Sequence, residues 1–245
     1  MIPKIIHYCW FGRKPLPNLA KKCIDSWKKY LPNYEIKEWN EENFDVNMIP
    51  YIKEAYNEKK YAFVSDYARF WILYNYGGVY FDTDVELIKP IDDILQKGAF
   101  IACELDGINV SVAPGLGISC NPGLDIYKEF VDGYKNRKFI KDDGTLDKTT
   151  ICVYTTNILK KHGLQNINTI QKVEDIYVYP KEYFNPFDFE TRLVKTTKNT
   201  RSIHHYASTW ETPYARNRAR LYTMFSKLFG EKISLFIRKL IGRNK

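Results

Sequence analysis

The chain has 245 residues, a length typical of one globular domain, and its hydrophobic fraction of 44% is sufficient for a buried core. Its net charge is +8, and residues 213–245 account for all of it, with nine lysines or arginines against one acid, Glu231. Residues 1–212 are therefore neutral overall, which argues against nucleic-acid binding by this part of the chain. No run of 18 apolar residues is present, so we expect no transmembrane helix.

The five cysteines are scattered along the chain and form no C-x-x-C pair. This pattern disfavours a disulfide framework or a zinc cluster and is typical of a protein in a reducing cytoplasm. The first residues form a short apolar segment rather than a charged region that leads into a long apolar stretch. We therefore expect no targeting segment.

Segments of strand and helix character alternate along the first third of the chain. In residues 16–31, apolar side chains recur at steps of three and four, which predicts an amphipathic helix. The predicted strands are residues 4–8, 34–39 and 79–81, and the predicted helices are residues 16–31, 49–59 and 61–76. Gly77-Gly78 ends the last of these helices. The alternation predicts an α/β fold with a mostly parallel central sheet flanked by helices.

The pattern is less regular after residue 81. Strands are predicted at residues 99–104, 108–112, 176–180 and 202–206, helices at residues 123–134 and 155–162, and a polar loop at residues 139–147. In residues 221–241 apolar side chains recur at helical spacing with basic residues between them, which predicts one or two amphipathic helices. We therefore divide the chain into a main domain, residues 1–212, and a basic amphipathic helical tail, residues 213–245.

Two aspartates follow the strand predicted after the glycine pair, in the sequence Phe81-Asp82-Thr83-Asp84. Because side chains alternate along a strand, Asp82 and Asp84 emerge on the same side. Two carboxylates at the carboxyl end of a strand provide the oxygen ligands that suit Mn²⁺ or Mg²⁺. A divalent ion there can neutralise the charge that builds on a departing diphosphate. D-x-D is also a common tripeptide at turns, so its context decides its meaning.

The context is the preceding helix, which carries Asp66 and Arg69 on one face. On an exposed surface such an i, i+3 ion pair would have little energetic weight. The flanking residues are largely apolar, however, and leave little of this helix for solvent. We therefore expect the charged pair to be held near a site, where the arginine fork suits the oxygens of a diphosphate.

These residues form a recognisable block. The sequence Ala62-x2-Ser65-Asp66-x2-Arg69-x4-Tyr74-x2-Gly77-Gly78-Val79-Tyr80-Phe81-Asp82-Thr83-Asp84 closely resembles the DXD-containing sugar-binding region of glycosyltransferase family 32. That family includes bacterial capsule and lipopolysaccharide enzymes and yeast mannosyltransferases, and the block also resembles the catalytic domains of the large clostridial glucosylating toxins. Residues 2–10, 39–40 and 202–210 are similar to the family's opening strand, the end of its second strand and its closing H-H-x-x-x-S-W pattern, with Thr209 where Ser is usual.

The resemblance spans about residues 2–212 and implies a GT-A fold, a nucleotide-diphosphate sugar donor, a Mn²⁺ or Mg²⁺ cofactor and retention of anomeric configuration. It implies catalytic roles for Asp66, Arg69, Asp82 and Asp84, and donor binding by His7, Trp10, Trp39, Ala62, Asp66, Arg69, Tyr80, Asp82 and Trp210. Asp84 would ligate the metal, Asp82 would contact the metal or the donor, and Trp210 would close over the diphosphate.

A late histidine would complete the metal site. Adjacent histidines in a strand point to opposite faces, so at most one of His204 and His205 is expected to reach the metal, and His205 is preferred. Glu104, in the strand after the D-x-D block, is a candidate contact for the acceptor or the donor.

The resulting hypothesis is a retaining glycosyltransferase that uses a UDP-sugar in preference to a GDP-sugar. Its acceptor would be a lipid-linked glycan, and the reaction would belong to capsule, O-antigen or exopolysaccharide synthesis. The leaving phosphate would accept the acceptor's proton, and a double displacement through a carboxylate remains open. The basic tail would hold the protein peripherally on the inner face of a bacterial membrane, or would instead pack on the body or form an oligomer contact.

Three other interpretations compete. A metal-dependent nucleotide-sugar hydrolase or phosphotransferase can also use a D-x-D site, although the chain contains no P-loop. A nucleic-acid-binding protein would need basic residues over the body, which is neutral. A non-catalytic glycan-binding module is disfavoured because the four charged residues of the block are intact.

Overall fold

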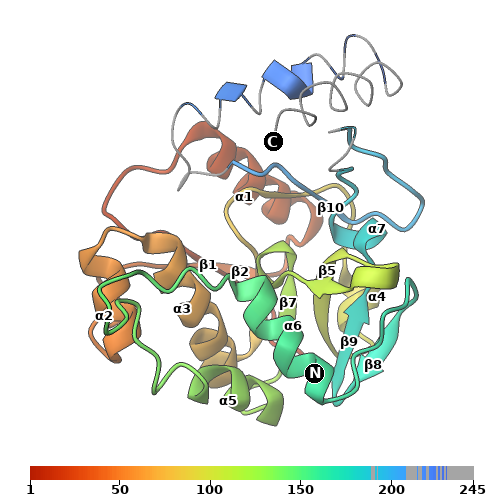
Figure 1. The fold of residues 1–245 in the computed structure, drawn as a ribbon. Helices are drawn as coiled ribbons and strands as arrows, with labels where there is room; N and C mark the ends of the chain where they lie inside the picture. The colour runs from red at the N-terminus through yellow and green to blue at the C-terminus, as the bar shows by residue number, and fades with distance from the viewer. Residues whose placement is uncertain are drawn as a thin grey trace.

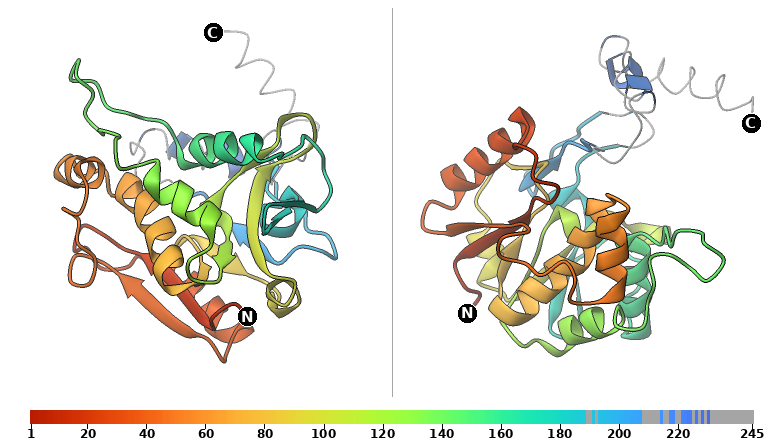
Figure 2. Two further views of the ribbon diagram at one scale, coloured as in Figure 1. Left: turned by 90° about the horizontal axis from the view of Figure 1, so that it is seen from below. Right: turned by 90° about the vertical axis from the view of Figure 1, so that its left-hand side faces the viewer.

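The computed structural model describes residues 1–188, 191 and 193–207, together with residues 214, 217, 218, 221–224, 226, 228 and 230. Helices cover both faces of a central sheet (Figures 1 and 2). In the right-hand view of Figure 2, α1 (Asn18–Tyr30) lies on one side of the sheet and α3 (Tyr61–Tyr76) lies on the other.

The sheet has the order β2-β1-β3-β7-β5-β9-β8, with β6 paired to β5. Its strands are β1 (Ile5–Cys9), β2 (Glu35–Trp39), β3 (Gly78–Tyr80), β5 (Ala99–Leu105), β6 (Ser111–Val112), β7 (Ile118–Cys120), β8 (Gln171–Val173) and β9 (Ile176–Tyr179). Strands β1, β2, β3, β5 and β9 run in one direction, and β6, β7 and β8 run in the other. The predicted α/β class with a mainly parallel sheet is therefore confirmed.

The other elements complete the layers. They are β4 (Val85–Leu87) and β10 (Ser202–His204), which pair antiparallel, the helices α2 (Pro50–Asn57), α4 (Asp92–Leu95), α5 (Asp125–Asp132), α6 (Ile151–Lys161) and α7 (Lys181–Phe184), and the 3₁₀ turns η1 (Gly107–Asn109) and η2 (Pro114–Leu116).

Two elements begin three or four residues later or earlier than predicted. The strand predicted at residues 108–112 begins only at Ser111, because the chain first turns through η1, where Gly107 has a φ of 73°. The helix predicted from residue 155 begins at Ile151, since the hydroxyl of Thr150 caps it by accepting from the amide of Val153. Strands β4, β7 and β8, with three residues each, and helices α4 and α7, with four residues each, are not predicted from the sequence.

The glycine pair between α3 and β3 is required by the backbone. Gly77 has a φ of 64° and Gly78 a φ of 95°, values that side-chain-bearing residues rarely adopt. A Cβ on Gly78 would also stand 2.6 Å from the carbonyl oxygen of Ile5 in the neighbouring strand. The pair thus lets the chain reverse tightly and bring the end of β3 next to α3.

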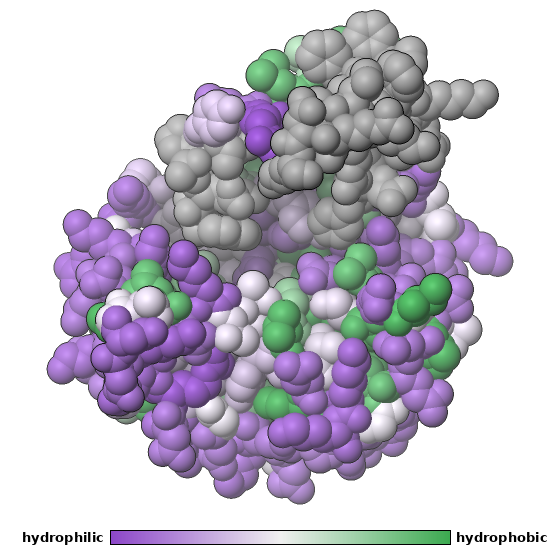
Figure 3. Space-filling model, viewed as in Figure 1, coloured by the Kyte–Doolittle hydropathy of each residue, from purple (hydrophilic) through white to green (hydrophobic). Residues whose placement is uncertain are grey.

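The described part of the tail is helical at residues 214, 217, 218, 221–224, 226, 228 and 230, and the rest of residues 213–245 lies outside the described chain. Among the described residues, no helix is long and apolar enough to cross a membrane. Figure 3 shows that the face carrying α6 is mainly hydrophilic, with hydrophobic side chains in small separate spots.

The buried imidazole of His7 joins three elements. Its Nδ1 accepts a hydrogen bond of 3.0 Å from the indole N–H of Trp39, so its Nε2 carries the proton and donates to the carbonyl oxygen of Gly77, also at 3.0 Å. Burial lowers the pKa of His7 to about 4, with the charge of Lys37 acting in the same direction and the Gly77 hydrogen bond opposing it. The folded protein therefore holds this ring neutral.

This arrangement predicts a specific acid sensitivity. The folded-state pKa of His7 lies below its value of 6.5 in the unfolded chain, so as the pH falls the unfolded chain binds the proton first. Stability contributed by neutral His7 should be lost between pH 6.5 and about 4, by about 3 kcal/mol in total. Urea unfolding followed by tryptophan fluorescence should show a shallower acid slope for His7→Gln than for the wild type.

The matched control is His162→Gln, because half-buried His162 pairs with Glu129 and Glu174 and its pKa is raised rather than lowered. That variant should keep the wild-type slope between pH 6.5 and 4. Equal slopes for His7→Gln and the wild type would contradict the assignment.

Candidate active site

The polar residues singled out in the sequence gather at one edge of the sheet. Strands β1, β2, β3 and β5 point the same way, because the single strand β7 between β3 and β5 is antiparallel to both. Their carboxyl ends carry Trp10, Asn40, Asp82 and Glu104. In α/β sheets this is the edge where ligands bind.

Arg69 is the centre of the site. From the third turn of α3 its Nη2 lies 3.1 Å from Oδ1 of Asp66 and 3.1 Å from Oδ1 of Asp82. Its Nε donates to the carbonyl oxygen of Ser65, and its guanidinium lies 5.0 Å from the ring centre of Tyr80. The predicted proximity of Asp66 and Arg69 is present, and one buried cation joins the helix to the aspartate that follows β3.

The carboxyl group of Asp66 is buried beside this cation. Burial raises the pKa of Asp66 to about 7, and the charges of Arg69 and Arg137 act against that effect. Buried carboxylates with raised pKa values are concentrated at functional sites. Asp66 can therefore exchange a proton near neutral pH, which suits a group that binds hydroxyls.

Asp82 has only just enough room. Its Oδ1 accepts from Arg69 and from the hydroxyl of Tyr80, and its backbone amide donates to the carbonyl oxygen of Gly115 in η2. A Cβ on Gly115 would overlap Oδ2 of Asp82. The missing side chain at residue 115 thus leaves the space that this carboxylate occupies, a requirement that the sequence alone did not reveal.

Asp84 is held by the antiparallel pair β4–β10. Nε2 of His204 lies 3.0 Å from its Oδ1, and the amide of Ala207 donates to its Oδ2 at 2.9 Å. Asp84 is half-buried, and the loss of solvent would raise the pKa of its carboxyl group, but the contacts with His204 and Ala207 outweigh this effect and lower it. The same contact raises the pKa of His204 against the effect of burial.

His205 is the histidine preferred from the sequence to reach the metal, but the structure places His204, and not His205, beside Asp84. Nε2 of His205 lies 2.7 Å from Oε2 of Glu86, away from Asp84. The register explains the exchange, because His204 pairs with Val85 across the two strands and so lies next to the D-x-D loop. His204 is the histidine that can share a site with Asp84.

The other residues that the family resemblance implies for donor binding do not all line the carboxyl ends of the strands. His7 and Trp39 are buried and hydrogen-bonded to each other, so they support the edge from within and do not line it. Tyr80 is also buried and acts on Asp82 through its hydroxyl group. Ala62 is exposed in the first turn of α3, and Trp210 lies outside the described residues.

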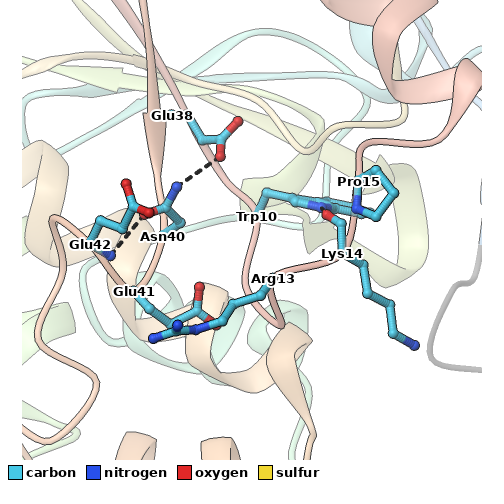
Figure 4. A pocket seen from close by; sticks show the side chains of 8 residues that line it. All are labelled: Trp10, Arg13, Lys14, Pro15, Glu38, Asn40, Glu41 and Glu42. Atoms are coloured by element: carbon cyan, nitrogen blue, oxygen red, sulfur yellow. Dashed lines mark hydrogen bonds between the residues drawn. The ribbon is translucent and has the colours of Figure 1, made fainter.

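Trp10 borders a cavity of about 490 Å³ at the ends of β1 and β2. Figure 4 shows Trp10, Lys14 and Pro15 on one side of it and Asn40 and Glu42 on the other. The indole N–H of Trp10 donates to the carbonyl oxygen of Lys14 at 2.6 Å, which fixes the ring at the cavity wall. The cavity combines one aromatic wall with polar groups, a lining that suits a heterocyclic base and its ribose.

Glu104 lies on the opposite flank of the edge, at the end of β5. Its Oε1 accepts from the hydroxyl of Ser111, and its charge acts on His204, Tyr206 and Cys152. The structure thus places one more carboxylate near Asp84 without joining it to Arg69.

The residues present suit a metal that is shared with a substrate. Within the described chain, no three His, Cys, Asp or Glu side chains gather closely enough to hold a metal ion alone. Asp82 and Asp84 still offer carboxylate oxygens on the D-x-D loop. Mg²⁺-type ions are commonly bound by one or two carboxylates together with substrate phosphates, so this donor set fits such an ion.

The fold is of the GT-A type. A solved structure of a glycosyltransferase involved in glycosylation of the major capsid of PBCV-1 has a similar fold, with a TM-score of 0.50, 12% identity and coverage of 88% of this chain and 98% of that one. Residues 17–101 match the family described as the glycosyltransferase sugar-binding region containing a DXD motif. The matched region covers about a third of the chain and includes α3 and the D-x-D aspartates.

Curated relatives also match part of the chain. Inositol phosphoceramide mannosyltransferase 1 of Schizosaccharomyces pombe is 31% identical over 121 residues, which are 45% of this chain and 36% of that protein. An uncharacterised glycosyltransferase of Acanthamoeba polyphaga mimivirus is 26% identical over 194 residues, 76% of each chain. The present chain therefore spans about a third of the length of the yeast relative and about three quarters of the viral one.

The contact between Gly115 and Asp82 leads to a prediction. Gly115→Ala should displace the carboxylate of Asp82, because the new Cβ would overlap Oδ2. A displacement of about 1 Å at a reacting centre can lower the rate about 100-fold, so sugar transfer should fall by that order. The measurement is the initial rate of glycosyl transfer, with circular dichroism to confirm the fold.

Gly144→Ala is the control for backbone strain away from the site: Gly144 has a φ of 80°, which strains alanine, but a Cβ at that exposed turn meets no atom within 4 Å. It should retain the wild-type rate. A fully active Gly115→Ala variant would show that Asp82 need not occupy its observed position.

Proposed function

We propose that this protein is a metal-dependent, retaining glycosyltransferase that moves a sugar from a nucleotide-diphosphate donor to a glycan acceptor. The observation that carries the proposal is the bridge from Asp66 through Arg69 to Asp82 beside Asp84, at the ligand-binding edge of the sheet. A fixed cation among carboxylates can bind both parts of such a donor, the hydroxyl-rich sugar and the anionic diphosphate.

The donor would lie along the edge with its nucleoside at Trp10. A UDP-sugar is favoured, and its base would stack on the indole ring of Trp10 in the cavity at the ends of β1 and β2. The two acidic side chains that Arg69 joins would then face the sugar, and Asp66 would accept hydrogen bonds from its hydroxyls. Arg69 would donate to the sugar or to the diphosphate, since its fork binds two oxygens together.

Asp82 and Asp84 would hold Mn²⁺ or Mg²⁺. When bound, such an ion neutralises charge on the diphosphate as it leaves. The side chains around the two aspartates prepare them for this role: Tyr80 and Arg69 orient Asp82, and His204 with the amide of Ala207 orients Asp84. The low pKa of Asp84 keeps its carboxylate charged at neutral pH.

The chain's own groups would direct the transfer to the retained face. Asp66 and Arg69 would fix the sugar so that the acceptor hydroxyl attacks from the side of the departing phosphate. That phosphate oxygen would take the hydroxyl proton, and Glu104 offers a carboxylate on the flank where the acceptor would enter. A double displacement through an enzyme carboxylate would give the same configuration.

The acceptor is proposed to be a lipid-linked glycan in capsule, O-antigen or exopolysaccharide synthesis. The curated yeast relatives are, by name, inositol phosphoceramide mannosyltransferases, which supports an acceptor attached to lipid. The basic residues of the tail support a location at the inner face of a bacterial membrane, because anionic lipids attract such segments.

The proposed glycosyltransferase activity and its metal dependence can be tested by thermal unfolding with UDP-glucose, UDP-galactose and GDP-mannose, each with and without Mn²⁺. One donor at 100 times its dissociation constant should stabilise the folded protein by about 2.7 kcal/mol, and only when Mn²⁺ is present. Asp84→Asn should lose the metal-dependent part of the shift, because it removes a charged ligand.

Asp142→Asn is the matched control, since that carboxylate is 91% exposed and pairs with Lys138. It should respond as the wild type does. A metal-dependent shift that persists in Asp84→Asn would exclude the metal assignment, and release of free sugar with no glycan product would instead identify a nucleotide-sugar hydrolase.

The membrane proposal has its own test. Replacing Lys232, Arg238 and Lys239 by Glu should reduce co-sedimentation with phosphatidylglycerol vesicles, because each basic residue near such a surface contributes about 1 kcal/mol. The charge-matched control replaces exposed Lys53, Lys59 and Lys60, on and after α2, by Glu. Equal loss in the two triple variants would show that net charge, and not the tail, governs binding.

A further inference from the structure

Tyr206 adopts an unusual backbone conformation beside the D-x-D loop. Its φ is 48°, in the left-handed region that a bulky aromatic residue rarely occupies. The other non-glycine residues with positive φ in the described part of the chain are Arg13, Lys59 and Glu174, and all three are exposed. Backbone strain of this kind is concentrated at functional sites, so it indicates a role for Tyr206.

The strained residue lies between two amides that both reach Asp84. The amide of His205 donates to the main-chain oxygen of Asp84 at 3.0 Å, and the amide of Ala207 donates to its Oδ2 at 2.9 Å. In a regular strand, amides two residues apart point the same way but lie about 7 Å apart along the chain. The left-handed turn at Tyr206 breaks this spacing, so the second amide can meet the carboxylate of the same residue.

The ring of Tyr206 packs on the histidine that contacts Asp84. Its centre lies 4.0 Å from that of the His204 imidazole and 5.1 Å from that of the ring of Phe187, which is buried after α7. Nε2 of His204 lies 3.0 Å from Oδ1 of Asp84. The tyrosine ring therefore joins the imidazole to a buried part of the fold.

This packing replaces a hydrogen bond that is usual in such sites. A histidine beside a metal is commonly oriented by its second ring nitrogen, which donates to a carboxylate or a carbonyl oxygen. Nδ1 of His204 is inaccessible to solvent and has no hydrogen-bond partner among the described residues. The ring of Tyr206 is therefore the group placed to fix the plane of the imidazole.

We propose that Tyr206 is a positioning residue for the metal-binding carboxylate of Asp84. Its ring sets the imidazole of His204 on Oδ1, and its left-handed backbone directs the amide of Ala207 to Oδ2. In this role Tyr206 acts without touching the metal or the donor. The inference rests on the proposed function, in which Asp84 holds Mn²⁺ or Mg²⁺, and it assigns Tyr206 to the metal-dependent part of donor binding alone.

The experiment measures the affinity for UDP and for GDP by calorimetric titration, with and without Mn²⁺. For the nucleotide that binds, the ratio of the two affinities is the Mn²⁺-dependent gain. Tyr206→Asn should lower this gain about tenfold, because asparagine tolerates the left-handed backbone but lacks the ring. Its affinity without Mn²⁺ should stay at the wild-type value. Tyr206→Phe keeps the ring and should retain the gain.

Lys59→Asn is the matched control. Lys59 has a similar left-handed backbone, with a φ of 56°, on an exposed turn after α2. The variant receives the same replacement in the same backbone region and should bind as the wild type does.

A second measurement, by NMR of the metal-free protein, follows the contact itself. The amide proton shift of Ala207 reports its hydrogen bond to the carboxylate of Asp84. Tyr206→Asn should move this shift toward its value in Asp84→Asn, and Tyr206→Phe should leave it unchanged. The amide of Phe81, which donates to the carbonyl oxygen of His7, should keep its shift in all variants because the central sheet stays intact.

A double-mutant cycle decides whether Tyr206 acts through Asp84. In the Asp84→Asn background, Tyr206→Asn should cause no further loss of the gain. The inference alone is wrong if Asp84→Asn removes the gain and Tyr206→Asn does not, if Tyr206→Asn weakens binding equally with and without Mn²⁺, or if Tyr206→Phe loses as much as Tyr206→Asn. If Asp84→Asn leaves the gain intact, the proposed role of Asp84 is wrong and the inference is overturned with it.

Discussion

The site depends on one buried cation held between two carboxylates. Arg69 contacts Asp66 on its own helix and Asp82 beyond the neighbouring strand, so it fixes the distance between α3 and the end of β3. The ionised form of Asp66 would be unstable in this buried position without Arg69, because burial of an unpaired charge is costly. The glycine pair that ends α3 brings the helix and the strand close enough for this contact.

The rest of the edge is arranged around that triad. The turn η2 passes so close to Asp82 that only glycine fits at residue 115, and the pair β4–β10 brings His204 to Asp84 from a distant part of the sequence. The same edge offers an aromatic cavity on one flank and Glu104 on the other. A substrate with a base, a charged linker and a polar sugar matches this order of surfaces.

Local patterns were sufficient to predict part of the site. The spacing of Asp66 and Arg69 along a helix, and the alternation of the two D-x-D aspartates, depend only on residues near one another in sequence. The choice between His204 and His205 depends on the register of β10 against β4, which no local pattern encodes. The role of Gly115 depends on where η2 crosses the loop after β3. Contacts of this kind arise from the packing of distant segments. The same is true of the short antiparallel strand β7, which lies between the parallel strands β3 and β5.

The most direct test of the account is calorimetric titration of the wild type and of Arg69→Lys with UDP-glucose and GDP-mannose in the presence of Mn²⁺. Lysine keeps the charge but cannot contact two carboxylates and a donor with one planar fork. The account predicts that the wild type binds one of these donors at one site per chain and that Arg69→Lys binds it at least about tenfold more weakly. An unchanged affinity in a folded Arg69→Lys variant would contradict the claim that this cation organises donor binding.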